Sequence, residues 1–249
     1  MKSALRFVGL LLLALLALQL YFILRIAAMA VIVPESTTFE RSQAWQIASK
    51  KGGLPWSQQW VPYAQISDNL KRAVIASEDD GFSTHGGVDW DAINKAWDKN
   101  AKAEQRAAAR KPAAPQAAAN AKPSKPPKII GGSTITQQLA KNLFLAGERT
   151  LLRKGQELVV TLLLEQFLSK ERILEIYLNH VEWGEGVFGA EAASQHYFRK
   201  SASKLNTYEA ARLAVMLPRP RYFEKLPNSA YVAGRANVIV GRMGDAQLP

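Results

Sequence analysis

The chain has 249 residues, a formal net charge of +11 and no cysteine. The absence of cysteine from the sequence excludes a disulfide-stabilised scaffold, a cysteine-ligated zinc site and a thiol nucleophile. Apolar residues make up 48% of the sequence, which is enough for one sizeable core and argues against a wholly disordered chain. The positive charge suggests a polyanionic or anionic-membrane partner, and its position along the chain decides between them.

The charge is concentrated in two segments. Residues 1–33 carry three bases and no acid, and residues 95–128 carry nine bases and two acids, so the remainder has a formal charge of only +1. The basic run at 95–128 contains one aromatic residue, Trp97, among many alanines and prolines. Nucleic-acid-binding domains usually present their bases on a folded face together with aromatic residues. We therefore expect no nucleic-acid partner.

The first 33 residues predict a membrane anchor. Residues 8–24 are apolar apart from Gln19, and the apolar run resumes after Arg25. About 20 apolar residues cross a bilayer as a helix. The bases Lys2 and Arg6 then keep the N-terminus in the cytoplasm and export the rest of the chain, in accordance with the positive-inside rule.

A cleaved signal peptide is the alternative interpretation, because residues 28–30 have the small-x-small pattern of a cleavage site. The apolar run is longer than the usual signal core, and Arg25 interrupts the approach to that site. Both observations favour the uncleaved anchor, and in either case most of the chain functions outside the cytoplasm.

The remainder predicts an all-α domain over 61–249, preceded by a polar tether over 34–60. Apolar spacing and capping residues predict helices over 67–77, 134–144, 151–168, 170–180 and 207–217, the last capped by Thr207. The helix over 151–168 is so apolar that we expect it deep in the core. Strand signals are sparse, and no internal repeat is visible.

An insertion at about 98–128 interrupts this pattern. Residues 101–110 have strong helix propensity, but five prolines between 112 and 127 prevent any long element. Because the segment has no apolar periodicity, we expect it to be exposed or mobile.

Four polar clusters interrupt the helical pattern where a core alone would not need them. They contain Glu78, Asp79, Asp80, His85 and Asp89; Ser133 to Gln138 with Lys141 and Asn142; Arg149, Arg153, Lys154 and Glu157; and Lys170, Glu171, Glu175, Tyr177 and Asn179. The last is most simply the polar face of a structural helix.

The first cluster has two interpretations. Adjacent carboxylates at a helix end repel one another and raise the pKa of one of them, which suits a proton-transferring base. A solvated acidic turn explains the same residues equally well.

The second and third clusters offer cations and donors. Gln138, Lys141 and Asn142 lie near one another on a helix, where they can bind an oxygen-rich ligand. Arg153 and Glu157 are four residues apart and could form an ordinary surface ion pair. Ionisable groups in an otherwise apolar helix more often serve a site.

Five segments, in order, resemble the motifs of the family 51 peptidoglycan glycosyltransferases. They are SEDDGFSTHGGVDW, GGSTITQQLAKNLFL, RKGQE, KERILEIYLNHVEWG and EAARLAVMLPRP. With an anchor before these motifs and a short segment after them, the chain is most similar to the monofunctional biosynthetic members. The resemblance implies an α-helical, lysozyme-like fold and polymerisation of lipid II, on a growing glycan-diphospholipid, at the outer face of a bacterial inner membrane.

The resemblance also implies roles for individual residues. Glu78 matches the general base that deprotonates the 4-hydroxyl of the acceptor N-acetylglucosamine, whose oxygen displaces the donor diphosphate with inversion to form a β-1,4 bond. Lys141 and Arg149 match residues that bind the donor pyrophosphate. Glu157 matches a second acid, which either orients those cations or assists departure. The remaining polar wall is matched by Asp79, His85, Ser133, Gln137, Asn142, Arg153 and Lys154.

The segment from Trp90 to Ile130 departs from the family pattern, because it is longer than the expected connection and rich in alanine, proline and lysine. The family has a mobile lid here, near the donor site. We hypothesise a solvated loop whose lysines lie near anionic headgroups or the substrate diphosphate.

Other functions explain the sequence less well. A lytic enzyme on the same scaffold needs a catalytic glutamate but gives no reason for cations at a diphosphate. A bifunctional penicillin-binding protein needs a transpeptidase domain. The S-x-x-K pattern of such a domain occurs in this sequence at 201–204, but no transpeptidase domain is expected after it. A non-catalytic membrane scaffold within the wall-building machinery would not need the polar clusters. No metal-ligand spacing appears, so we expect no cofactor, although some family members are assayed with divalent cations.

Overall fold

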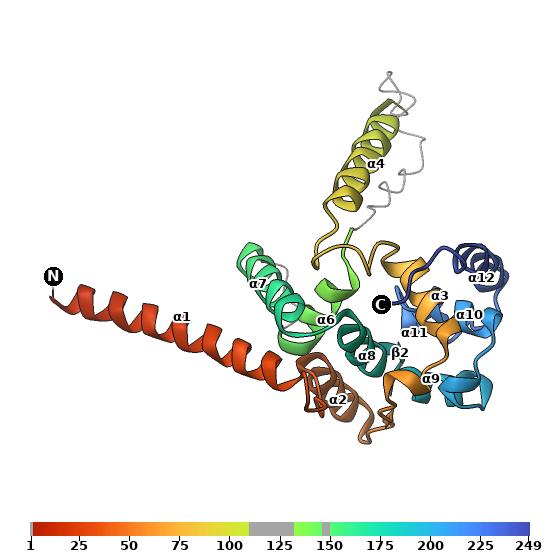
Figure 1. The fold of residues 1–249 in the computed structure, drawn as a ribbon, viewed down its shortest axis with the longest axis horizontal. Coiled ribbons are helices and arrows are strands. Elements are labelled where there is room, and N and C mark those ends of the chain that lie inside the picture. The colour runs from red at the N-terminus through yellow and green to blue at the C-terminus, as the bar shows by residue number, and fades with distance from the viewer. Residues whose placement is uncertain (1, 110–131, 146–149) are drawn as a thin grey trace. The chain divides into compact units, whose positions relative to one another are not determined.

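The computed structural model describes residues 2–109, 132–145 and 150–249 (Figure 1). It divides into two compact units, Met1–Gly87 with Thr134–Pro249, and Val88–Ser133. Arg149 and the part of the insertion from 110 to 128 lie outside the described residues. The two units are therefore described separately.

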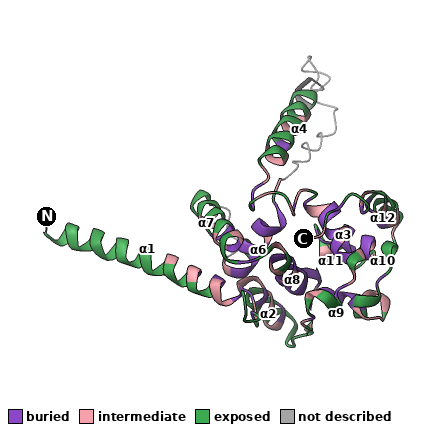
Figure 2. Ribbon diagram, in the orientation of Figure 1, coloured by how far each residue is buried: buried purple, intermediate pink, exposed green. Residues whose placement is uncertain are grey.

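The N-terminal helix α1 (Lys2–Ala28) is long and apolar enough to cross a membrane. Only 6% of the most apolar stretch of α1 is buried, so α1 is not a core helix. Figure 2 shows it exposed along most of its length. Phe22 and Ile26 near its end are buried against the domain, and Gln19 exchanges hydrogen bonds with Gln156. These features agree with a single-pass anchor.

The segment expected to be a tether is partly folded, so that prediction was wrong for its central residues. Helix α2 (Thr38–Lys51) begins with a capping box, in which Thr37 and Glu40 each accept a hydrogen bond from the other's backbone N–H. Glu40 and Ile47 are buried. The helix has no clear apolar stripe, and its stability comes from capping and from these two inward side chains.

The main unit is helical, which confirms the predicted fold class. Its further helices are α3 (Asp68–Glu78), α6 (Ile135–Phe144), α7 (Leu151–Phe167), α8 (Lys170–His180), α9 (Ala190–Phe198), α10 (Thr207–Met216), α11 (Pro220–Phe223) and α12 (Ala230–Arg242), with 3-10 turns at Tyr63–Gln65 and Ala202–Lys204. Asn206 caps α10, not Thr207 as predicted. The Asn206 side chain accepts from the Glu209 N–H, and the Glu209 carboxylate accepts from the Asn206 N–H.

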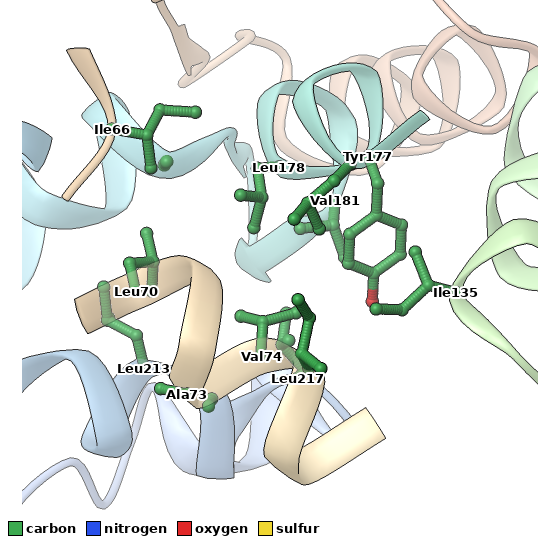
Figure 3. Packing of buried hydrophobic residues seen from close by; sticks show 14 of the residues in the cluster. Ile66, Leu70, Ala73, Val74, Ile135, Tyr177, Leu178, Val181, Leu213 and Leu217 are labelled. Atoms are coloured by element: carbon green, nitrogen blue, oxygen red, sulfur yellow. The ribbon is translucent and has the colours of Figure 1, made fainter. Parts of the chain in front are cut away.

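The core lies between α3, α8 and α10. Figure 3 shows Leu70 and Val74 of α3 facing Leu213 of α10, with Leu178 of α8 on the other side. All four side chains are fully buried. Burial of such a side chain contributes about 1.5–3 kcal/mol, so this packing fixes the direction in which α3 ends.

A small sheet closes one side of this core, which the sparse strand signals did not predict. Strands β1 (Ser57–Gln58), β2 (Glu182–Gly184) and β3 (Val187–Phe188) pair in the order β1-β3-β2, with β1 parallel and β2 antiparallel to β3. Trp183 of β2 is buried and donates to the Leu213 carbonyl at 3.1 Å.

Helix α7 is less buried than its composition predicts, so the expectation of a deep core helix was wrong. Val160, Thr161 and Leu164 point inward, whereas Leu151 and Leu152 are 93% and 87% exposed. Leu158, Val159, Leu162 and Phe167 are exposed as well. A helix that is apolar on all sides suits either a core or a lipid environment, and α7 packs beside the apolar α1.

The second unit contains α4 (Trp90–Ala109). The Asp89 carboxylate accepts from the Ala92 N–H at 2.7 Å and caps its start. The helix propensity predicted for 101–110 is confirmed as far as residue 109, and side chains 101–106 are exposed apart from the partly buried Ala103.

We expect Gly186→Ala to destabilise the main unit. The Gly186 carbonyl accepts from the Ser57 N–H at 2.8 Å, which joins the β2–β3 turn to β1. Gly186 has φ +77°, and a Cβ there would lie 2.0 Å from the Pro55 carbonyl oxygen. Backbone strain of this kind costs about 1–3 kcal/mol. Thermal unfolding of the detergent-solubilised chain measures it, with Gly244→Ala, which has open space around its Cβ, as the control. Equal melting temperatures for the two variants would contradict the strain argument.

Candidate active site

Glu78 is the last residue of α3, and its carboxylate is partly buried. Its Oε2 accepts a hydrogen bond from Gln138 Nε2 at 3.0 Å. Desolvation raises the pKa of Glu78, the charge of Asp79 adds to that rise, and the hydrogen bond from Gln138 opposes it. Glu78 therefore combines ready proton uptake with a fixed orientation, as a general base requires.

Gln138 is held in turn by Tyr177 of α8. The Tyr177 hydroxyl donates to Gln138 Oε1 at 3.1 Å, so the amide nitrogen is left to donate to Glu78. Tyr177 is 1% exposed, and this chain of bonds is anchored in the core. The sequence prediction chose Gln137 for the site, although the spacing of Gln138 and Lys141 already placed Gln138 beside the other polar residues.

Asp79 connects the end of α3 to the start of α6. Its Oδ2 accepts from the Ile135 backbone N–H at 2.9 Å, and its Oδ1 lies 2.8 Å from His85 Nε2. His85 Nδ1 accepts from the Gly87 N–H, so its Nε2 carries the proton and donates to Asp79. Both predicted residues therefore bond to protein groups, which favours a positioning role.

Gln137 has its hydrogen-bond partner at the start of its own helix. Gln137 is buried and completes the capping box of α6, where its Oε1 accepts from the Thr134 N–H. Thr134 is the N-cap of α6 and donates to the Gly87 carbonyl at 2.7 Å. Ser133 is exposed and belongs to the second unit.

Glu157 is the centre of a cation cluster on α7. The carboxylate is 4% exposed and accepts from Arg153 Nη1 at 2.7 Å and from Lys154 Nζ. Lys141 of α6 is close enough for its pKa to respond to all three. Desolvation lowers that pKa, Glu157 raises it, and Arg153 and Lys154 lower it further.

The cation cluster has hydrogen-bond donors that are available to a ligand. Arg153 Nε is buried and has no hydrogen-bond partner among the described residues. Lys141 is exposed and Lys154 is half-exposed, so both can reach a ligand. Asn142, next to Lys141, is buried. Three cations around one acid give the cluster a formal charge of +2, counted over Lys141, Arg153, Lys154 and Glu157.

A partly buried acid that the sequence did not single out, Glu165, connects α7 to α6 and α8. Glu165 accepts from Thr136 Oγ1 at 2.6 Å and pairs with Lys170 Nζ at 2.8 Å. Gly87, at φ +85°, packs so closely that a Cβ would lie 2.8 Å from Glu165 Cγ. These contacts of Glu165 stabilise the packing of α6 against α7. Its signal in the sequence was only an acid in an apolar helix.

No three histidine or acidic side chains gather as metal ligands in the part of the chain that the structure describes. The site instead consists of one carboxylate with a raised pKa and a cluster of cations. Gln138, beside the carboxylate, and Lys141, in the cluster, are three residues apart on α6 and share one face of it. Such a site defines a group-transfer enzyme that activates a hydroxyl next to an anionic leaving group.

Comparison with known proteins agrees with that class. The transglycosylase family matches residues 46–109 and 112–244, and the chain belongs to this family, whose lysozyme-like fold was predicted. A "Biosynthetic peptidoglycan transglycosylase" from Burkholderia thailandensis is 52% identical over 94% of this chain and 83% of its own length. Proteins with the same name from Herminiimonas arsenicoxydans and Janthinobacterium sp. are each 50% identical over 94% of this chain and 92% of theirs.

We expect Asp79→Asn to destabilise the fold, because it removes the charge that holds the α6 N-terminus and His85. Loss of a buried charged hydrogen-bond partner costs about 1–3 kcal/mol. Denaturant unfolding in detergent measures the effect. The adjacent Asp80→Asn is the matched control, since Asp80 is exposed and pairs with Arg242 at the surface. If both substitutions cost the same, Asp79 does not connect the two helices.

Proposed function

We propose that this chain is a peptidoglycan glycosyltransferase that polymerises lipid II for bacterial cell-wall synthesis. The observation that carries the proposal is the placement of Glu78 and the cation cluster beside one face of α6, through Gln138 and Lys141. A hydroxyl can be deprotonated on one side of this face while a diphosphate departs on the other. The 50–52% identity to proteins named as biosynthetic peptidoglycan transglycosylases supports the same activity.

The reaction is one displacement with inversion. Glu78 takes the proton of the acceptor 4-hydroxyl as its oxygen attacks the anomeric carbon of the donor sugar. The bond from that carbon to the diphosphate oxygen breaks, and a β-1,4 bond forms. Burial of Glu78 raises its pKa and makes its carboxylate a stronger base than one in water.

The cation cluster stabilises the leaving group. A lipid-linked sugar diphosphate carries two negative charges, which match the formal +2 of Lys141, Arg153, Lys154 and Glu157. Charge grows on the departing oxygen in the transition state, so fixed cations there accelerate the reaction. Of the two roles left open for Glu157, its bonds to Arg153 and Lys154 support orientation of the cations.

The other predicted residues have supporting roles in this proposal. Asp79 and His85 hold the turn that follows Glu78, and Gln137 caps the helix that carries Lys141. Asn142 lies beside Lys141. Arg149 remains a predicted pyrophosphate ligand and Ser133 a predicted wall residue.

The proposed location is the bacterial inner membrane, with the N-terminus cytoplasmic and the catalytic domain periplasmic. The exposed apolar helix α1 and the exposed leucines of α7 support contact with the bilayer, where a polyprenyl-linked substrate resides. Lys2 and Arg6 before the span support the orientation.

We expect Glu78→Gln to abolish polymerisation, because the amide cannot accept the acceptor's proton. Loss of a general base reduces the rate by about 10²–10⁴-fold. Electrophoresis of the glycan strands formed from purified lipid II by the full-length chain measures this, with Asp80→Asn as the control of unchanged activity. Full polymerisation by Glu78→Gln would refute the assignment, and cleavage of finished strands without synthesis would indicate a lytic enzyme.

We expect Gln138→Leu to move the acidic limb of the pH–rate profile to higher pH. Gln138 lowers the pKa of Glu78 by hydrogen bonding to its charged form, so its removal leaves desolvation less opposed and the pKa rises further. The base must be deprotonated to act, and activity at low pH therefore falls most. Initial rates across pH measure the shift, with the exposed Gln59→Leu as the control. An unchanged midpoint in Gln138→Leu would contradict this coupling.

A further inference from the structure

A hollow of about 260 Å³ lies where the chain leaves the apolar helix α1 and enters the domain. Val33, Pro34 and Glu35 form one of its walls, and Trp56, Trp60 and His180 contribute to the others. Glu35 is exposed, and Trp56 and Trp60 are partly buried. None of these residues belongs to the proposed catalytic site.

His180, which lines this hollow, has an unpaired and buried polar atom. The residue is 1% exposed, and its Nδ1 lies 2.7 Å from Glu40 Oε1. Gln58 Nε2 lies 3.2 Å from Nδ1 as well, but Glu40 Oε1 and the Asn179 carbonyl accept its two hydrogens. Nδ1 therefore carries the proton and donates to Glu40, which also accepts from the Thr37 N–H. The Nε2 atom is then a hydrogen-bond acceptor, and among the described residues nothing bonds to it.

A buried acceptor without a partner is costly unless a ligand supplies the donor. The other groups around the hollow indicate that this donor is positively charged. Glu35 provides a carboxylate, and the indoles of Trp56 and Trp60 provide faces that attract cations. Arg172 already lies 5.4 Å from the centre of the Trp60 ring, which shows that this ring accepts a cation.

An adjoining hollow of about 300 Å³ has the opposite charge. It shares the wall Val33, Pro34 and Glu35, and it is lined by Arg25 and Arg41. Arg41 already donates from Nη1 to Ser36 and from Nη2 to Thr38 Oγ1. Its remaining N–H groups and the Arg25 guanidinium suit a phosphate. The two hollows together offer a cation site and an anion site on either side of one short wall.

The position of the two hollows limits what can occupy them. Helix α1 ends at Ala28, and both hollows lie within the turn and extended segment that follow it. If α1 spans the bilayer, this is the depth of the lipid headgroups, where tryptophan side chains also concentrate.

We propose that these two hollows bind the headgroup of an aminophospholipid, with its primary ammonium in the His180 hollow and its phosphate in the Arg25–Arg41 hollow. The ammonium donates to His180 Nε2 and is balanced by Glu35, while the phosphate lies between the arginines. A choline headgroup has no N–H to donate, and a glycerol headgroup has no positive charge. The site therefore selects phosphatidylethanolamine over both and ties the domain to the membrane surface beside its anchor.

Native mass spectrometry of the full-length chain in detergent tests this with phosphatidylethanolamine, phosphatidylcholine and phosphatidylglycerol of identical acyl chains. A hydrogen bond to a charged group is worth about a factor of ten in affinity, so we expect about tenfold higher retention of phosphatidylethanolamine. Glu35→Gln and Arg25→Gln should each lower that retention, whereas Glu171→Gln, an exposed carboxylate outside both hollows, should not.

His180→Phe should remove the preference for phosphatidylethanolamine over phosphatidylcholine. If this variant does not fold, ¹⁵N-histidine NMR of the unaltered chain replaces it, because the chain has only three histidines. The Nε2 resonance of His180 should then shift with phosphatidylethanolamine and not with phosphatidylcholine. Equal retention of all three lipids, a preference for phosphatidylglycerol, or no effect of Glu35→Gln would overturn the proposal, as would an unchanged His180 resonance.

Discussion

The buried carboxylate of Asp79 is the interaction on which the site depends. It follows Glu78 directly, accepts from the first N–H of α6 and holds His85. A negative charge at a helix N-terminus is stabilised by the helix dipole and by the unpaired N–H groups there. One side chain therefore fixes the end of the helix that carries the base and the start of the helix that carries Lys141. The distance between base and cations is thus set by the core.

The two halves of the site use burial differently. Desolvation of Glu78 disfavours its charge and raises its pKa, which suits a group that must take up a proton. Glu157 is more deeply buried and pairs with Arg153 and Lys154, and in the proposed mechanism it orients these two cations. Both acids lie in similar polar clusters in the sequence. Their partners differ, and on this difference we propose Glu78 as the proton acceptor and Glu157 as the residue that orients the cations.

In the proposed location, contact with the membrane would involve more than the anchor. Helix α7 carries the cations on one side and exposed leucines on another, and α1 packs against it. In the proposed mechanism, a diphosphate bound to Arg153 and Lys154 would lie close to the surface where its lipid tail is soluble. The proposed headgroup site at the end of α1 would add a second attachment on the same domain.

The sequence by itself determined the elements whose signals are local. Apolar spacing and capping residues were enough to predict the anchor, the start of α6 at Thr134, the ends of α3 and α8, and the presence of Glu78 among the candidates. They were not enough to predict helix α2, because its stability depends on Glu40 and Ile47 reaching a core that other segments build. The exposure of α7 could not be predicted from the sequence either, because a core helix and a helix that faces lipid have the same apolar composition. The spacing along the sequence placed Gln138 beside Lys141, but only the tertiary structure shows that Gln138, and not Gln137, bonds to Glu78. One residue along a helix turns the side chain by about 100°, and only the packing of α6 against α3 and α8 shows which of the two faces the base.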